Sequence, residues 1–158
     1  MNAAHLHLFF VHVPVIGVYF GLLLFLYSWA FKKNETMRVS FGVLTLVGIA
    51  AGVVFLTGEA AEEIVENVAG ISEKLIEEHE GAAKLALILG IALGVSGLVG
   101  VIASLRVPVA PSWLKAAVLV FGLVATGALT RTAYLGGQIN HPEIQDAQAQ
   151  FSIEEHDD

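Results

Sequence analysis

The chain has 158 residues, of which 56% are hydrophobic and only 15% are charged, and its formal net charge at neutral pH is -7. A soluble domain carries about 25% charged residues, so the composition indicates a membrane protein rather than a soluble enzyme. The acidic balance argues against a nucleic-acid partner. The absence of cysteine excludes disulfides, thiolate zinc sites and cysteine-ligated iron–sulfur clusters.

Four apolar segments reach the length of about 20 residues that a helix needs to cross a bilayer. In chain order these are Leu8–Phe31, Val39–Thr57, Ala82–Leu105 and Trp113–Leu135. The N-terminus lacks the basic region and the cleavage site of a signal peptide, so the first segment is expected to stay in the protein. The sequence therefore predicts an all-α fold, an integral membrane up-down four-helix bundle. It would comprise residues 1–142, followed by an acidic, flexible tail at 143–158.

The connection between the second and third segments is long and acidic. Four glutamates recur on one helical face, at Glu59, Glu62, Glu63 and Glu66. Asn67 and Gly70 offer a break, after which Ser72 is suited to cap the next helix. Helices two and three are therefore expected to extend beyond the membrane as an acidic hairpin.

Cationic residues concentrate in the other two connections and beside them, at Lys32, Lys33, Arg38, Arg106 and Lys115. The positive-inside rule then places these two connections in the cytoplasm. Both termini, the acidic hairpin and all six histidines would lie on the periplasmic side of a bacterial inner membrane.

Counting residues outward from each turn predicts which side chains share a level, because each helical residue rises about 1.5 Å. The turns are expected near residues 35–36, 69 and 109–110. These centres place His12 opposite Glu59, Glu59 opposite His79, and His79 beside His141. The sequence therefore predicts a ring of imidazoles and a carboxylate near the outer face.

A second layer, containing His5 and Glu62, is expected farther out. His5 and His12 are seven residues apart and share a helical face, whereas His7 is expected to point away from it. Ionisable groups within a membrane are expensive and usually functional.

The leading hypothesis from these residues is a transition-metal centre near the outer face, used for redox or metal handling. Helix bundles hold one or two metals with inward His and Glu side chains. The predicted metal ligands are His12, Glu59, His79 and His141, followed by Glu62 and His5. Imidazole and carboxylate together suit iron or zinc, with copper as a further option.

Two other functions are open at this stage. The first is electron transfer by a b-type haem with His12 and His79 as axial ligands and Arg131 on a propionate. The second is a non-catalytic role as a subunit of a larger membrane complex, docked through the acidic hairpin. An electron-transfer function would require a redox partner, and the glycine-rich faces favour a homodimer.

The chain also resembles a family of small bacterial four-span membrane proteins, catalogued as domain of unknown function twenty-two thirty-one. The matching residues are the opening HLFFVHVP at residues 7–14, the Thr-Gly-Glu at 57–59, His79, and Gly136-Gly137 followed by His141. The resemblance covers most of the chain and implies a four-helix membrane fold with functional histidines. It implies no particular activity.

Overall fold

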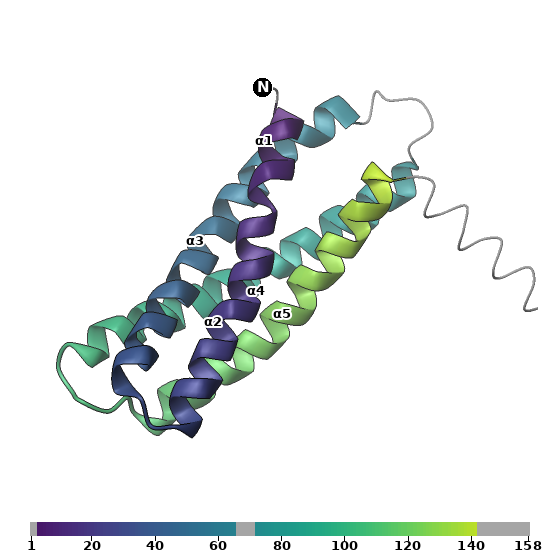
Figure 1. Ribbon diagram of the computed structural model, residues 1–158. Helices are drawn as coiled ribbons and strands as arrows, with labels where there is room; N and C mark the ends of the chain where they lie inside the picture. Colours follow the sequence, from purple (N-terminus) through teal and green to yellow (C-terminus); the bar gives the residue numbers. More distant parts are fainter. Residues whose placement is uncertain (1–2, 66–71, 142–158) are drawn as a thin grey trace, which may run out of the picture.

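The computed structural model describes residues 3–65 and 72–141, and in these ranges the chain is helical, with no strand. Figure 1 shows the arrangement of the helices. They are α1 (Ala3–Phe10), α2 (His12–Ala30), α3 (Asn34–Val65), α4 (Glu73–Ser104) and α5 (Ser112–Asn140). The all-α helical bundle expected from the sequence is confirmed. The acidic tail, Glu66 and the break at Asn67 and Gly70 lie outside the described residues.

The first two helices behave as a single span interrupted at one residue. Val11 has helical backbone angles, and its N–H donates to the carbonyl of His7 at 2.9 Å. Pro14 has no N–H for the carbonyl of Phe10, so the helical hydrogen-bond ladder loses a rung at this point. The interruption between α1 and α2 follows from that missing donor.

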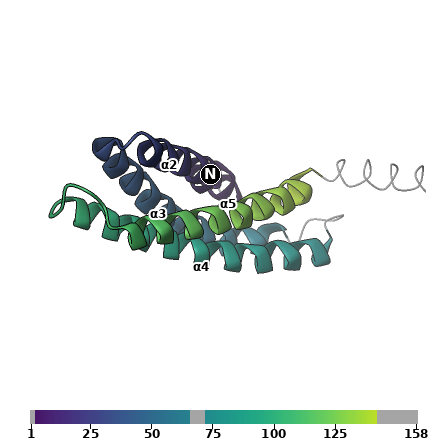
Figure 2. The same ribbon diagram turned by 90° about the horizontal axis from the view of Figure 1, so that it is seen from below.

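The four long helices form a closed ring. Neighbouring pairs are α2 with α3, α3 with α4, α4 with α5, and α5 with α2. Within the described residues the diagonal pairs α2–α4 and α3–α5 make no contact. In Figure 2, which views the molecule from below, α2 lies above α5 and α5 lies above α4, while α3 runs from beside α2 down to the level of α4. The order along the chain and the order around the ring are therefore the same, as an up-down bundle requires.

Glycines bring α3 and α4 into close contact. A Cβ atom added to Gly48 would lie 2.7 Å from the Cα of Gly94, and one added to Gly100 would enter the ring of Phe41. Gly90 and Gly97 on the same helix are also buried. Small residues that let two backbones approach are the usual packing device of membrane helices. These glycines therefore serve the packing of α3 against α4.

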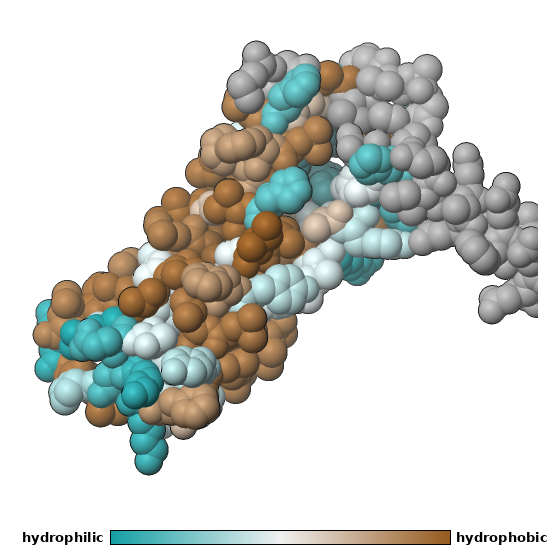
Figure 3. All heavy atoms as spheres, viewed as in Figure 1, coloured by the Kyte–Doolittle hydropathy of each residue, from teal (hydrophilic) through white to brown (hydrophobic). Residues whose placement is uncertain are grey.

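The core is apolar, and its two buried hydroxyls are satisfied locally. Ser28 and Ser40 each donate to the carbonyl three residues earlier, at 2.7 and 2.8 Å. Many large apolar side chains are also exposed, and the face shown in Figure 3 is mostly brown along the middle of the bundle. Four helical segments are long and apolar enough to cross a membrane: 4–30, 34–64, 73–104 and 112–139.

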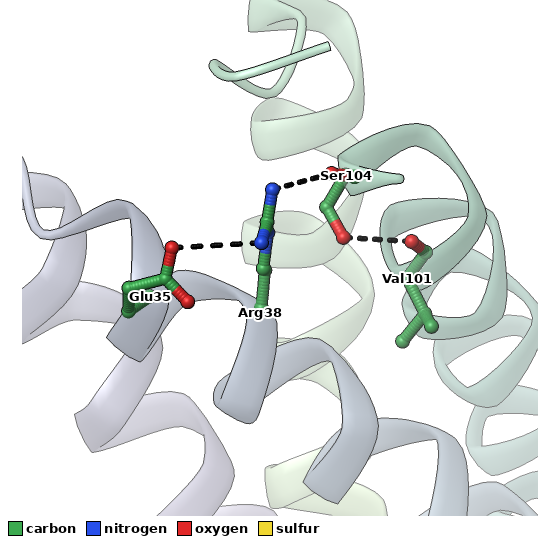
Figure 4. A network of polar contacts seen from close by, with 4 residues as sticks. All are labelled: Glu35, Arg38, Val101 and Ser104. Carbon is green, nitrogen blue, oxygen red and sulfur yellow. Dashed lines mark hydrogen bonds and ion pairs between the residues drawn. The ribbon is translucent and has the colours of Figure 1, made fainter. Parts of the chain in front are cut away.

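The end of the bundle that carries the two short connections is fastened by polar contacts. Arg38 at the start of α3 donates to the carbonyl of Ser104 at the end of α4, at 2.7 Å, and pairs with Glu35 at 3.5 Å (Figure 4). The Ser104 hydroxyl donates to the carbonyl of Val101 at 2.7 Å. Lys32, with a φ of 53°, closes the turn that links α2 to α3. We call this the basic end, and the opposite end the outer end.

Candidate functional site

His7 lies half-buried between α1 and α3 at the outer end. Its Nδ1 atom is 3.1 Å from the carbonyl oxygen of Val54 and 3.4 Å from the hydroxyl of Thr57. A carbonyl oxygen can only accept, so Nδ1 is the protonated nitrogen of the neutral ring, and Nε2 keeps its lone pair. Gly58 lies against the imidazole, because an added Cβ would be 3.2 Å from the His7 Cε1 atom.

His79 on α4 has the same surroundings, provided by α5. Its Nδ1 atom is 3.1 Å from the carbonyl oxygen of Thr132, so this ring is also protonated at Nδ1. Gly136 lies against it, with an added Cβ 3.0 Å from the His79 Cε1 atom. In both places the glycine follows the accepting carbonyl by four residues, which is one helical turn.

These two surroundings form a matched pair of sockets, each made of a histidine, a backbone carbonyl and a glycine. The His7 socket joins α1 to α3, and the His79 socket joins α4 to α5, two arms that separate toward the outer end in Figure 1. The two imidazoles lie within electrostatic range of each other. We call His7 and His79 the imidazole pair.

The carboxylates of the outer end face a lysine. Glu80 forms an ion pair with Lys84, one turn along α4, with 2.6 Å between the Oε1 and Nζ atoms. Glu59 and Glu62 on α3 lie within electrostatic range of the same ammonium group. Glu80 therefore pairs with Lys84, and Glu78 pairs with Lys74 at 3.8 Å, whereas the two imidazoles bond to backbone carbonyls.

The structure does not bring the predicted ring of ligands together. The side chain of His12 is exposed, and its Nδ1 bonds to the carbonyl of Leu8 in the preceding turn, at 3.0 Å. Within residues 3–65 and 72–141 no group of three or more His, Asp or Glu side chains is placed to hold a metal ion. His79 is the one predicted residue that joins the imidazole pair.

The other predicted residues are dispersed over the outer end. His5 on α1 and Arg131 on α5 are exposed, and Glu62 is partly buried on α3. His141 is exposed just after α5, where its backbone N–H donates to the carbonyl of Gly137 at 2.9 Å. Arg131 precedes Thr132, whose carbonyl holds His79.

His7 was expected to point away from the site, and this expectation was wrong. The expectation assumed that the helical face with His5 and His12 points into the bundle. In the structure, α1 instead turns the face with His7 toward α3. The sequence contained a signal for this contact. Thr57 provides a hydroxyl for the imidazole, and Gly58, which has no side chain, leaves space for the ring. Gly136 gives the same signal opposite His79.

No family model, curated protein or solved structure matches this chain. The resemblance to a family of bacterial four-span membrane proteins therefore stays a prediction, and the function must be argued from the site.

Proposed function

We propose that the chain is a membrane protein that carries electrons through a redox cofactor held by His7 and His79, and that this cofactor is a b-type haem. The observation that supports it is the matched orientation of the two rings. Each donates its Nδ1 proton to a backbone carbonyl and keeps the Nε2 lone pair. Metal-binding histidines almost always have this arrangement, because the second hydrogen bond fixes the tautomer and the direction of the ring.

The number of donors favours haem over a bare metal ion. Zinc in a structural site takes four protein ligands and in a catalytic site three, whereas a haem iron needs at most two axial ligands from the protein. The pair supplies two imidazoles, and the carboxylate next to His79 in the chain, Glu80, pairs with Lys84 instead. A bound haem would supply one-electron transfer, and the chain would supply the ligands and the apolar surroundings. Arg131, exposed beside Thr132, is positioned to attract a propionate.

The second candidate is the metal centre with histidine and glutamate ligands that the sequence favours. One observation supports it: Glu62 lies one turn beyond Gly58 on α3, on the segment that forms the His7 socket. A movement of that carboxylate toward the pair would give a three-ligand site for iron, zinc or copper. This version predicts a metal without a porphyrin.

The proposed location is a bacterial inner membrane, with the outer end in the periplasm. Helices α3 and α4 have 32 residues each. That number corresponds to about 48 Å, longer than a hydrocarbon core of about 30 Å. The excess supports an acidic hairpin that extends into the periplasm. The cations of the basic end support the orientation by the positive-inside rule.

Three single variants test the assignment in protein produced with haem available and purified in detergent. We expect the wild type to show a Soret band that shifts on reduction. His7→Ala and His79→Ala should each lose most of this absorbance. His12→Ala is the matched control, because it removes an imidazole of the same span that bonds only to Leu8, and it should keep the full spectrum.

Metal analysis of the same samples separates the candidates. Stoichiometric iron, zinc or copper without a Soret band would replace haem by the bare-metal site. A protein with neither metal nor haem, or a spectrum that survives both His7→Ala and His79→Ala, would refute both candidates and favour a non-catalytic subunit.

A further inference from the structure

The basic end carries an apolar groove on the outside of the bundle. The last turns of α4 and the connection to α5 line it, with a volume of about 340 Å³. Its lining residues are Val99, Ile102, Ala103, Arg106, Val107 and Pro111. Arg106 is the one charged residue of this lining, and the surface of the groove is otherwise apolar.

The two arginines near the end of α4 differ in what they contact. Arg38 donates to the carbonyl of Ser104, and backbone N–H groups of residues 106 and 107 donate to the carbonyl of Ala103. Figure 4 shows how Arg38 reaches the end of α4 from α3. These carbonyls are satisfied without the Arg106 side chain. Within the described residues that guanidinium makes no hydrogen bond or ion pair, so it is available to a ligand.

We propose that this groove binds one anionic phospholipid, with an acyl chain along the apolar lining and the headgroup phosphate on Arg106. A guanidinium matches a phosphate in charge and in hydrogen-bonding geometry. Lys32, Lys33 and Lys115 lie at the same end of the bundle and add to the attraction for an anionic headgroup. The proposal depends on the membrane embedding proposed above, but not on the cofactor.

Native mass spectrometry of the delipidated protein, titrated with phosphatidylglycerol or phosphatidylcholine, tests this inference. We expect one phosphatidylglycerol to bind about tenfold more tightly than phosphatidylcholine. Arg106→Gln should remove this preference, and Arg106→Lys should retain part of it. Lys74→Gln is the matched control, because it removes an exposed cation at the outer end with the same change in charge.

A second variant tests the groove separately from its charge. Ala103→Phe should fill the channel while Arg106 remains, and it should weaken binding of both phospholipids. Equal binding by Arg106→Gln and Lys74→Gln would overturn the proposal, as would equal affinity of the wild type for the two lipids. A dimer that Ala103→Phe dissociates would also overturn it, since the groove would then hold a second copy. None of these readouts depends on haem or metal content.

Discussion

Replacing Gly136 by alanine tests whether the His79 socket holds the ring in the orientation that a cofactor needs. The added Cβ atom would lie 3.0 Å from Cε1 of His79 and 3.4 Å from its Nδ1, closer than ordinary van der Waals contact. The ring must therefore shift by a few tenths of an ångström. The hydrogen bond from Nδ1 to the carbonyl of Thr132 is already 3.1 Å long, so a shift away from Gly136 weakens it or redirects Nε2.

Two effects of Gly136→Ala on the free energy of unfolding oppose each other. Weakening a hydrogen bond of this kind costs about 1 kcal/mol. Alanine in place of glycine inside a helix contributes about 1 kcal/mol in the other direction. We therefore expect little change in stability. Cofactor affinity has no such compensation, and a loss of about 1 kcal/mol corresponds to a roughly fivefold weaker dissociation constant.

The neighbouring glycine provides the control. An alanine Cβ at Gly137 would meet nothing within 4 Å, so Gly137→Ala should gain the helical contribution without disturbing the socket. Haem titration and thermal unfolding in detergent measure the two quantities separately. Equal cofactor affinity in Gly136→Ala and Gly137→Ala would refute the idea that the glycine shapes the site. A parallel loss of stability in Gly136→Ala would show general disruption of the helix pair instead.

Three further predictions concern the bundle, each measured by unfolding in detergent. Gly48→Ala should destabilise by about 2 kcal/mol, because its Cβ would meet the backbone of α4, whereas Gly52→Ala meets nothing within 4 Å and should not. Lys32→Gly should stabilise by about 0.5–1 kcal/mol, since glycine adopts a φ of 53° without the penalty that lysine has; unchanged stability would mean that the turn is not strained. Tyr19→Phe should destabilise by only about 0.6 kcal/mol. It removes the 2.7 Å contact with Thr130, whose hydroxyl also donates within its own helix; a loss of several times that size would contradict this estimate.

The helices were predictable because their signals are local. Apolar runs located all four spans, and the glutamate spacing correctly extended the second span into its acidic continuation as far as Val65. Ser72 was correctly placed as the residue that precedes α4. Its side chain makes no capping hydrogen bond, and its carbonyl accepts from the N–H groups of Leu75 and Ile76 instead. Each of these features depends on residues less than one or two turns apart.

The site was less predictable because it depends on the positions of the turns. The first turn was placed at residues 35–36, midway between two apolar runs. Helix α3 begins earlier, at Asn34, because polar residues occupy its first turn, and the connection is only residues 31–33. Residues at equal distances from the centre of a turn lie opposite each other. An error of three to four residues in that centre therefore shifts the predicted partner of a residue by about seven residues, or about 10 Å. Glu59 is therefore not at the level of His12, and residues near Thr57 face His7 instead.

The third turn shows the same effect in the opposite helix pair. Its centre was placed at residues 109–110, and the connection is residues 105–111. His79 consequently lies at the level of Thr132 and Gly136 rather than Asn140, which leaves His141 farther out. The error at the second turn was of similar size, since Gly48 against Gly94 places its centre two residues from the prediction.

The two sockets together constrain the ligand more than either does alone. A single histidine bonded to a carbonyl next to a glycine is an ordinary way to satisfy a polar group in a membrane helix. The arrangement occurs twice, in two helix pairs, with the same nitrogen bonded and the same four-residue spacing from carbonyl to glycine. The sequences of α3 and α5 around Gly58 and Gly136 differ. Packing alone would therefore not require the same arrangement of histidine, carbonyl and glycine in both helix pairs. In the proposed function, a ligand held between two imidazoles would require both rings to present the same free nitrogen, and this requirement would account for the match.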